Sequence, residues 1–542
     1  MGRKEKRKQS RRGATTANRL SSALICLSIV VVCLTASVSR DVAAAGPSLN
    51  QVSGAILNAP AGTIHFVRTG NIYDDSALGF VYAKCSNPPQ NMIIQTDSTK
   101  INQTTGAPVF SGNMVLFGGC MASKVVDYHE GLGCAPITFS MDVSRFKFMR
   151  GAAIAYSVLR STYDYTKADY FVVQIYMNGS RTIFSIWGIE QTGTYAGGVY
   201  FCDVIHPNLS AYTQGYYICK WIDLNNDGIQ QSDEITVVAS GESTRATIKT
   251  LHLGKWIYNQ QLRPMFTDEY LAKMKETGFN TVQLFLTGEL KGSIYAAINL
   301  NYLYQCINKV KQAGLAVWVT PTAFPGHDIP KLPSYPVFKT AFLDFVKTNA
   351  QTLQGTGVDY FGLSEVEMLF ANQGWSSDDV NKNLIDFMPL AASTIRQVFS
   401  GRIILQISGS IWTLSAEAVD AYFKDVDIVG YDIGGEPAPG TSEDDLRRIY
   451  QEGYQEFATL AKGKHVPWMV GEYWMYDFVP GTSPPDYVKQ NELRNAQIVF
   501  DAYLKATPRG VGFAWDDNFT TFTLQPYGEA TRQAIKNFFS QL

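Results

Sequence analysis

The sequence predicts an α/β protein with two folded parts. Residues 246–542 are predicted to form a (β/α)8 barrel, and residues 46–245 a mixed α/β, strand-rich domain. In the C-terminal part, eight short apolar runs alternate with amphipathic segments, which is the strand and helix count of a (β/α)8 barrel. In the N-terminal part, short apolar runs are separated by Gly and Asn, a pattern typical of strands joined by turns.

Length and charge limit the function classes. The chain has 542 residues, a formal net charge of -2 and 46% hydrophobic residues. This length suits two or three domains with full-sized cores. The near-neutral balance argues against a nucleic-acid partner, because such proteins usually carry a basic face.

Residues 1–45 have the pattern of a signal peptide or a signal anchor. A basic start is followed by the apolar segment Leu20–Val38 and by small residues at Ala43–Ala45, which together resemble an export signal with its cleavage site. The apolar segment is also long enough to stay in a bilayer as an uncleaved anchor, the only membrane contact that we expect. Both alternatives predict a secreted or cell-surface protein.

The N-terminal domain shows strand patterns but no catalytic triad and no paired carboxylates. Residues 113–119 form an apolar run that ends in two glycines, as expected of a buried strand entering a turn. Residues 169–189 predict two strands joined at Asn178-Gly179, a strong hairpin signal.

Cysteine usage agrees with export. The spacings of Cys120–Cys134 and Cys202–Cys219 allow disulfides in an exported chain, but the sequence does not determine the pairing. No two of the cysteines form a CxxC pair, which argues against a zinc or redox centre. The cysteines beyond the leader are Cys85, Cys120, Cys134, Cys202, Cys219 and Cys306.

Residues 223–234 fit the twelve-residue calcium loop D-x-[DN]-x-[DN]-G-x5-E, with Gly228 permitting the tight turn. The flanking segments look like strands, so we expect a structural Ca2+ rather than an EF-hand sensor; the alternative is a solvated Asn/Asp turn. The expected ligands are Asp223, Asn225, Asp227, the carbonyl of Ile229, Gln231 through a water molecule, and Glu234 as a bidentate carboxylate.

Three stretches of the N-terminal domain, residues 115–131, 187–201 and 216–235, together resemble an S-layer-like domain of archaeal surface proteins. The resemblance implies a surface-displayed module for attachment or stabilisation, with the cell envelope as a possible partner and no chemistry of its own.

The C-terminal part repeats strand and helix patterns along its length, and several helical segments end in the Lys/Gly pattern of a helix stop. The alternative, a doubly wound open sheet, requires a glycine-rich phosphate loop after an early strand, and the sequence has none. The predicted strands are residues 248–254, 280–286, 315–321, 360–366, 402–408, 427–433, 467–473 and 510–515.

Two of these strands end in carboxylates. In residues 357–370 the apolar run is followed by Glu365 and Glu367, and in residues 465–476 it is followed by Glu472. An acid that leaves a hydrophobic strand is costly unless it is paired or lies in a cleft, and a barrel has its active site at these strand ends. Two such carboxyl groups suit a retaining glycosidase, which holds them roughly 5 Å apart. The alternative is a set of ion-paired residues at strand ends.

This arrangement resembles the clan A glycoside hydrolases, which carry the acid/base after strand four and the nucleophile after strand seven. The resemblance implies that Glu365 is the proton donor and Glu472 the nucleophile, with Glu367 a weaker candidate for the acid. It implies that Trp515 floors the sugar site and that Tyr431 hydrogen-bonds the nucleophile. Clan members usually have Asn before the acid/base. Here this position is Ser364, whose shorter side chain reaches less far toward the sugar 2-hydroxyl than an Asn side chain would.

Indoles stack on the apolar faces of sugar rings, so tryptophans near strand ends are candidate substrate contacts. Trp318 and Trp468 lie inside their strands and are expected to be core residues. The further candidate substrate-binding residues are Trp256, Trp375, Trp412, Trp474 and Asp432.

These observations predict an exported or cell-surface retaining β-glycoside hydrolase that acts on a polysaccharide or oligosaccharide and needs no cofactor for catalysis. One alternative is a non-catalytic carbohydrate-binding or surface-layer protein with a degenerate barrel. Another is a transglycosylase, in which a sugar instead of water accepts the glycosyl group from the covalent intermediate.

Overall fold

The structure is a computed structural model in which Gly46–Leu542 form one compact unit. Only the backbone is described for residue 265 and for residues 486–490. Among the described residues, no helix combines the length and the apolar character needed to cross a bilayer. The leader predicted in residues 1–45 lies outside the described residues, which are 46–243, 247–253, 263–291, 294–298, 300–322, 331–332, 334–434, 441–473, 486–516 and 528–542.

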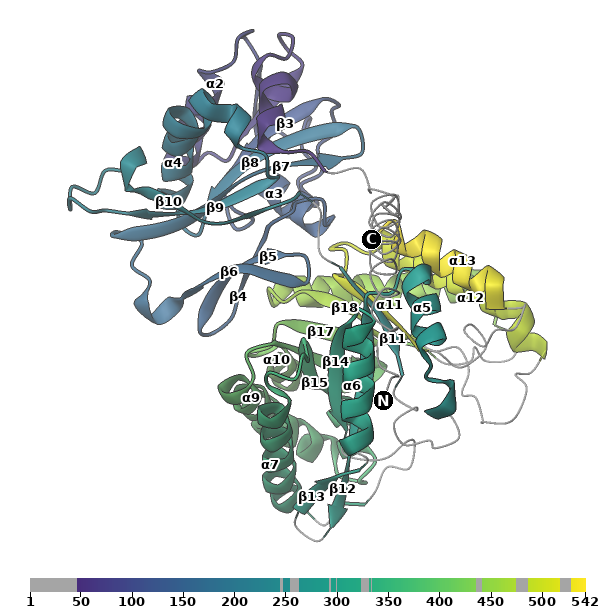
Figure 1. The fold of residues 1–542 in the computed structure, drawn as a ribbon. Coiled ribbons are helices and arrows are strands. Elements are labelled where there is room, and N and C mark those ends of the chain that lie inside the picture. The colour runs from purple at the N-terminus through teal and green to yellow at the C-terminus, as the bar shows by residue number, and fades with distance from the viewer. Residues whose placement is uncertain are drawn as a thin grey trace, which may run out of the picture. The chain divides into compact units, whose positions relative to one another are not determined.

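The C-terminal part is a closed barrel of eight parallel strands, as predicted (Figure 1). The ring closes where β11 pairs with β12, and a ninth strand, β13, lies antiparallel on the extended end of β12. In the described part of the chain the strands are β11 Ile248–His252, β12 Thr281–Lys291, β13 Ile294–Ala297, β14 Ala316–Thr322, β15 Tyr360–Ser364, β16 Arg402–Ser408, β17 Ile428–Asp432, β18 Trp468–Tyr473 and β19 Gly512–Asp516.

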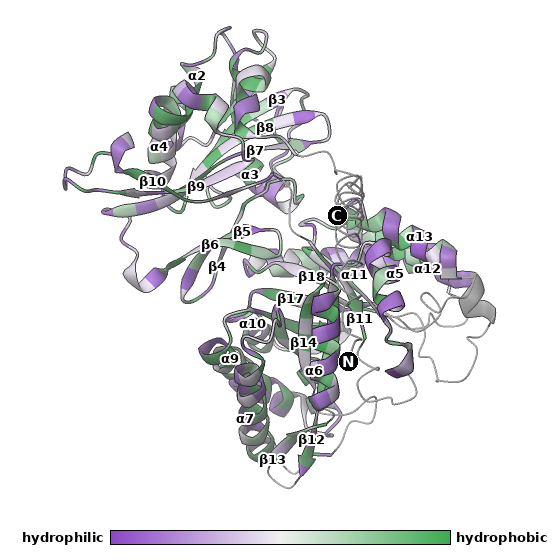
Figure 2. Cartoon of the chain, viewed as in Figure 1, coloured by the Kyte–Doolittle hydropathy of each residue, from purple (hydrophilic) through white to green (hydrophobic). Residues whose placement is uncertain are grey.

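Amphipathic helices cover the outside of the strand ring. In α6 the buried residues Leu303, Ile307 and Val310 recur at helical spacing, and hydrophilic residues occupy its outer side (Figure 2), the pattern of a helix that covers a core. The helices are α5 Asp268–Thr277, α6 Leu300–Gln312, α7 Tyr335–Leu353, α8 Val366–Ala371, α9 Ser377–Val398, α10 Ala416–Phe423, α11 Glu443–Gly463, α12 Asp486–Lys505 and α13 Gly528–Phe539.

The two faces of the barrel strands belong to different hydrophobic clusters. The larger cluster fills the space between strands and helices. A smaller one fills the barrel interior near the start of the strands, and it includes Ala152 from the turn between β5 (Arg145–Arg150) and β6 (Ala153–Leu159). The barrel is therefore packed and not a pore. The interior cluster consists of Ala152, Ile248, Trp318, Ile404, Ile428, Met469, Val511 and Ala514.

The N-terminal part is built on a mixed seven-stranded sheet with the order β10-β9-β7-β8-β3-β1-β2 among the described residues. The predicted hairpin is present: β7 and β8 are antiparallel and turn at Gly179, whose φ of 60° favours glycine. The strands are β1 Ile64–Arg68, β2 Asn91–Ile94, β3 Asn113–Phe117, β7 Ala168–Asn178, β8 Arg181–Gly188, β9 Tyr216–Ile222 and β10 Ile235–Gly241.

Helices and a small second sheet complete this part. Strand β4 (Thr138–Met141) pairs with β5, and β5 with β6. The α-helices are α2 Ile72–Tyr82, α3 Lys124–Gly131 and α4 Gln191–Tyr200. Neither disulfide that the spacing allows is formed, because Cys120, Cys202 and Cys219 are free thiols.

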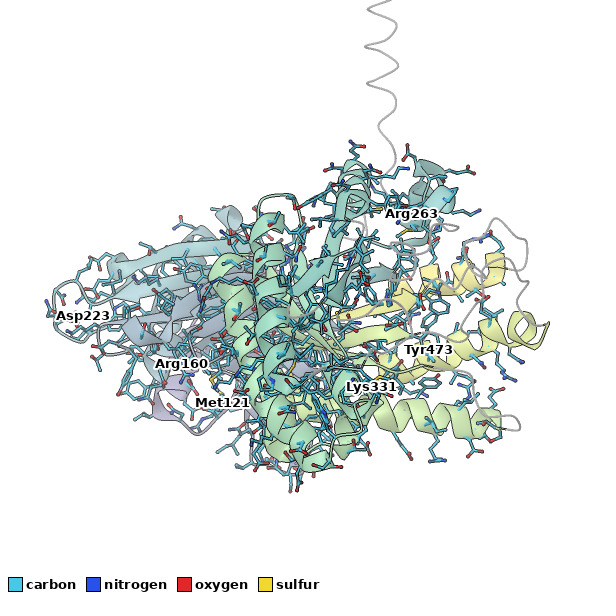
Figure 3. All side chains as sticks on the ribbon, turned by 90° about the horizontal axis from the view of Figure 1, so that it is seen from below. Met121, Arg160, Asp223, Arg263, Lys331 and Tyr473 are labelled. Carbon is cyan, nitrogen blue, oxygen red and sulfur yellow. The ribbon has the colours of Figure 1, made fainter. Side chains whose placement is uncertain are left out.

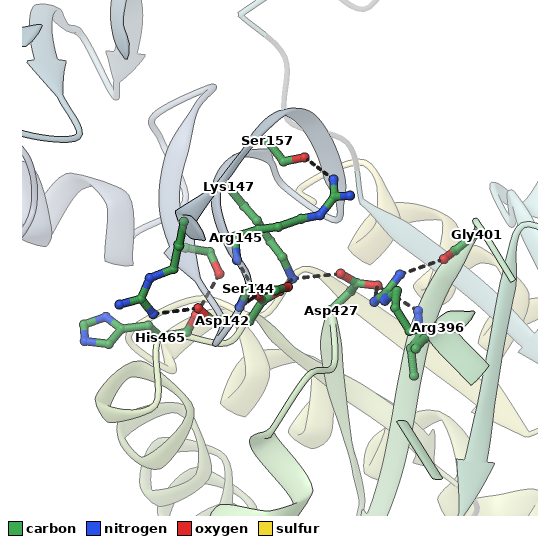
Figure 4. A network of polar contacts seen from close by, with 12 residues as sticks. Asp142, Ser144, Arg145, Lys147, Ser157, Arg396, Gly401, Asp427 and His465 are labelled. Carbon is green, nitrogen blue, oxygen red and sulfur yellow. Dashed lines mark hydrogen bonds and ion pairs between the residues drawn. The ribbon is translucent and has the colours of Figure 1, made fainter. Parts of the chain in front are cut away.

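A buried charge network joins strand β5 to the start of barrel strand β17 (Figure 4). The Lys147 ammonium donates to Asp427 at 2.9 Å and contacts Asp142 at 2.7 Å, and Arg396 also pairs with Asp427. Burial raises the pKa of Asp427, but the charges of Lys147 and Arg396 outweigh it, so this pKa lies below its ordinary value.

Candidate active site at the barrel mouth

A row of polar side chains lines the interior of the barrel where the strands end. Side chains two residues apart on a strand point to the same face. Counting in steps of two from the interior residues of β11, β17 and β19 brings His252, Asp432 and Asp516 to the interior face. All three are buried. Ionisable side chains therefore line the barrel interior at its mouth, whereas apolar side chains fill it near the start of the strands.

Glu472 reaches the same face through an irregularity in β18. Val470 and Tyr473 both pack in the cluster between strands and helices, although regular alternation would put residues three apart on opposite faces. The register between β17 and β18 shifts here, so that Asp432 pairs with Glu472 and Gly471 is the extra residue. Such a bulge re-aims side chains and is typical of active sites; here it sets Glu472 beside Asp432.

A chain of side-chain amides supports Asp432 from below. Gln283 donates to Thr320 at 2.9 Å and to the Gln406 carbonyl oxygen at 2.6 Å. Gln406 in turn donates to the two Asp432 oxygens at 3.4 and 3.3 Å and to the Gly471 carbonyl at 3.1 Å. These buried amides fix the position of the Asp432 carboxyl.

Glu365 follows β15 directly and caps the start of α8. Its backbone is left-handed, with φ 47° and ψ 43°, a conformation that costs a non-glycine residue about 1–2 kcal/mol and that is typical of functional sites. Burial, with the charge of Glu367 added, raises the pKa of Glu365 to about 8. This carboxyl group therefore holds its proton at neutral pH, as a general acid must.

Glu367 is buried in α8, and its carboxylate accepts three hydrogen bonds. Its carboxylate accepts from the Ser408 backbone N–H at 2.8 Å, the Tyr422 hydroxyl at 2.6 Å and the Ser410 hydroxyl at 3.3 Å. Only 1% of Glu367 is exposed. These contacts give Glu367 a structural role at the junction of α8, β16 and α10.

His252 and Asp516 flank Glu472 from strands β11 and β19. His252 Nδ1 lies 3.3 Å from Glu472 Oε2, and donor atoms of the three residues lie within 4.8 Å of one another. This spacing also suits a metal ion. We interpret the group as a polar cluster in which His252 and Asp516 lie beside the Glu472 carboxylate.

Two aromatic residues implied by the resemblance face the wrong side of the barrel. The Tyr431 ring stacks on Phe457 of α11, with ring centroids 4.5 Å apart, and Trp515 packs against Tyr473 and Phe500. Both belong to the cluster between strands and helices. Tyr431 and Trp515 therefore lie on the outer face of the strands and not at the positions beside Glu472 and under a sugar that the resemblance implies; their neighbours Asp432 and Asp516 occupy the interior face instead.

The other predicted substrate contacts differ in position. Ser364 ends β15 on the interior face, aligned with Gln406 of β16. Trp412 follows β16, is 45% exposed and donates its indole N–H to the Tyr431 hydroxyl at 3.3 Å. Trp375 is half-buried against Phe370 and Tyr335. Trp256 and Trp474 lie outside the described residues, whereas Trp318 and Trp468 are core residues, as expected.

The predicted calcium loop joins β9 to β10, and Figure 3 labels its first residue, Asp223. The Gly228 N–H donates to Asp223 at 3.0 Å, and Asn226 and Gly228 have φ of 60° and 72°. Glu234 is buried and accepts from Leu224 N–H and Trp221 Nε1–H. The predicted carboxylates Asp223, Asp227 and Glu234 thus sit on one compact turn, while Asn225 and Gln231 both donate to Asp227.

His252 and Gln406 are site residues that the sequence analysis missed. Both occupy interior positions by the same two-residue step that identifies the strands. That alternation, applied to residues 248–252 and 402–408, was the available signal.

No protein-family model and no curated protein sequence matches the chain. Solved structures that resemble it include the GH113 β-mannanase AaManA from Alicyclobacillus acidocaldarius, with 14% identity, coverage of 55% of this chain and 98% of that chain, and a TM-score of 0.39. A Bacteroides ovatus GH5 xyloglucanase has 12% identity, coverage of 60% and 85%, and a TM-score of 0.42. A GH5-4 broad-specificity endoglucanase from Clostridium longisporum has 13% identity, coverage of 54% and 96%, and a TM-score of 0.41. The barrel assignment itself rests on the strand order.

Proposed function

We propose that this protein is an exported retaining β-glycoside hydrolase that cleaves a polysaccharide or oligosaccharide with Glu365 and Glu472. One observation carries the proposal. These two glutamates leave strands β15 and β18 at the same mouth of a closed barrel, and strand β17, which carries Asp432, lies between those two strands in the ring.

In this mechanism Glu365 donates its proton to the glycosidic oxygen while Glu472 attacks the anomeric carbon. The Glu365 carboxyl group is protonated at neutral pH because its pKa is raised to about 8. Once the glycosyl group is bound to Glu472, Glu365 has become a carboxylate and acts as the base that activates water. The half-exposed indole of Trp412, beyond the end of β16, offers an apolar face for a sugar ring.

The test is a screen of the full chain on β-glucan, mannan, xylan and galactan, beside Glu472→Gln and Glu365→Ala. We expect Glu472→Gln to lose turnover on every substrate. Glu365→Ala should lose polysaccharide hydrolysis but retain cleavage of aryl β-glycosides, whose leaving groups need no proton. Glu417→Gln, at an exposed glutamate of α10, is the matched control and should behave as wild type.

Product analysis tests the stereochemistry and the acceptor. Retention of the anomeric configuration is expected, and azide should restore cleavage of an aryl glycoside by Glu472→Gly with inverted configuration. Sugar-containing products in place of hydrolysis would identify a transglycosylase. A wild-type chain that binds glycans without turnover, unaffected by Glu472→Gln, would identify a binding protein instead.

Two further expectations concern the N-terminal part. A structural Ca2+ in the loop of residues 223–234 is supported by the fit of the motif and by the left-handed backbone at Asn226 and Gly228. Attachment of this domain at the cell surface is supported by its resemblance to S-layer-like domains and by the leader pattern of residues 1–45. Fractionation of producing cells, with detection in the envelope, tests the second expectation.

A further inference from the structure

Asp432 occupies an unusual position for a substrate contact, because its carboxyl group is enclosed by the barrel. Only 2% of the residue is exposed. Gln406 donates to both carboxyl oxygens from below, and Gly471 leaves the space that the carboxyl fills, since a Cβ at position 471 would overlap Asp432 Oδ1. Asp432 is aligned with Glu472 across the β17–β18 pair.

We propose that Asp432 is a positioning residue for Glu472: it keeps its proton and donates it in a hydrogen bond to the Glu472 carboxylate. This inference rests on the proposed role of Glu472 as nucleophile. It also replaces the earlier expectation that Asp432 binds substrate.

Burial is the main reason why the proton stays on Asp432, and the charge of Glu472 adds to it. Ionisation of Glu365 would raise the pKa of Asp432 further, and Glu367 contributes less; this pKa lies well above its ordinary value. Two neighbouring carboxyl groups in a buried site cannot both ionise at low cost. His252 and Asp516 approach Glu472 from the β19 side, and the proposal therefore assigns the negative charge of the pair to Glu472, which has the His252 nitrogen beside it.

The hydrogen-bond inventory of this site fits a neutral acid. Gln406 contacts both Asp432 oxygens. In a protonated carboxyl group the carbonyl oxygen and the hydroxyl oxygen can both accept from Gln406, and the O–H proton is left to donate to Glu472. This bond would hold one Glu472 oxygen in place and leave the other to attack the anomeric carbon. It would also lower the pKa of Glu472, because a hydrogen bond to the charged form favours that form.

Asparagine is the matched replacement for this role, because its amide accepts from Gln406 and donates to Glu472 as a neutral acid does. We expect Asp432→Asn to lower kcat/KM by less than about tenfold. Asp432→Ala, which removes the donor, should lower it by about 10- to 100-fold and move the acidic limb of the pH profile upward by about one unit. Thermal melting identifies variants that fail to fold.

A second measurement, infrared spectroscopy, detects the proton on Asp432 independently of turnover. Infrared spectra of the full chain at pH 7 should contain protonated-carboxyl C=O absorption, one part of which disappears in Asp432→Asn and another in Glu365→Gln. If the wild type hydrolyses nothing, the proposed function fails, and the infrared band still decides whether Asp432 holds a proton. Loss of activity in Asp432→Asn as large as in Asp432→Ala, or a protonated band unchanged by Asp432→Asn, would overturn the inference.

Discussion

His252 Nδ1 lies 3.3 Å from Glu472 Oε2, although β19 separates their two strands in the barrel. The His252 ring is also held by Phe285, with ring centroids 4.8 Å apart. Glu472 thus lies between the His252 nitrogen, on the β19 side, and Asp432, which is aligned with it on β17; in the proposed mechanism both neighbours affect the reactivity of its carboxylate.

We expect His252→Phe to weaken the nucleophile while keeping the packing of the ring against Phe285. Loss of the nitrogen near Glu472 removes a polar group that favours the charged carboxylate, so kcat/KM should fall by about tenfold. The pKa of Glu472 should rise, which moves the acidic limb of kcat/KM to higher pH. Steady-state rates across pH 4–7 measure both effects. An unmoved acidic limb would contradict the prediction.

The raised pKa of Glu365 predicts the alkaline limit of activity. Burial, and then the charge of Glu367, raises the pKa of the Glu365 carboxyl group to about 8. In the proposed mechanism the protonated form is the active one. Activity should therefore persist at neutral pH and be lost as the pH rises through about 8. Glu367→Gln removes the second cause, so the alkaline limb of kcat/KM should move to lower pH; a shift to higher pH would contradict the assignment.

Alternation along the strands explains what the sequence predicts well and where it falls short. The two apolar runs that end in Glu365 and Glu472 mark the ends of strands. The barrel is predicted from the repeated alternation of all eight apolar runs with amphipathic segments. The extra residue at Gly471 depends on how β17 and β18 align, which no single segment encodes. The resemblance implies site roles for Tyr431 and Trp515, but alternation along β17 and β19 puts both side chains on the outer face.

The hydrogen bonds of Glu367 predict a stability role distinct from catalysis. Glu367→Ala would leave the Ser408 N–H and the Tyr422 hydroxyl buried without their acceptor. We expect a loss of about 2–4 kcal/mol in the free energy of unfolding, measured from urea midpoints. Tyr422→Phe removes only one donor and should cost less. Equal effects of the two substitutions would contradict this assignment.

The ion pair between Lys147 and Asp427 predicts sensitivity to substitution and to acid. Lys147→Met leaves Asp427 with Arg396 as its cation and should cost about 3 kcal/mol. Because the folded pKa of Asp427 lies below its ordinary value of 3.8, its stabilising contribution is present above that pH and is lost as the pH falls through the lowered value. The difference in unfolding free energy between wild type and Lys147→Met should therefore shrink in acid; a constant difference from pH 7 to pH 3 would contradict this.

The loop between β9 and β10 predicts a stabilising effect of calcium on the full chain. Asp223, Asp227 and Glu234 carry three negative charges on one turn, and a bound cation would neutralise their repulsion. At a Ca2+ concentration of about 100 times Kd, the free energy of unfolding should rise by about 2.7 kcal/mol, and chelation should reverse the gain.

Glu234→Gln should weaken the binding of Ca2+ measured by calorimetry. Asp233→Asn, at an exposed loop position that is not an expected ligand, is the matched control and should bind as the wild type does. A melting temperature unaffected by millimolar Ca2+ would identify the segment as a solvated turn, held by its own Asp223 and Asp227 hydrogen bonds.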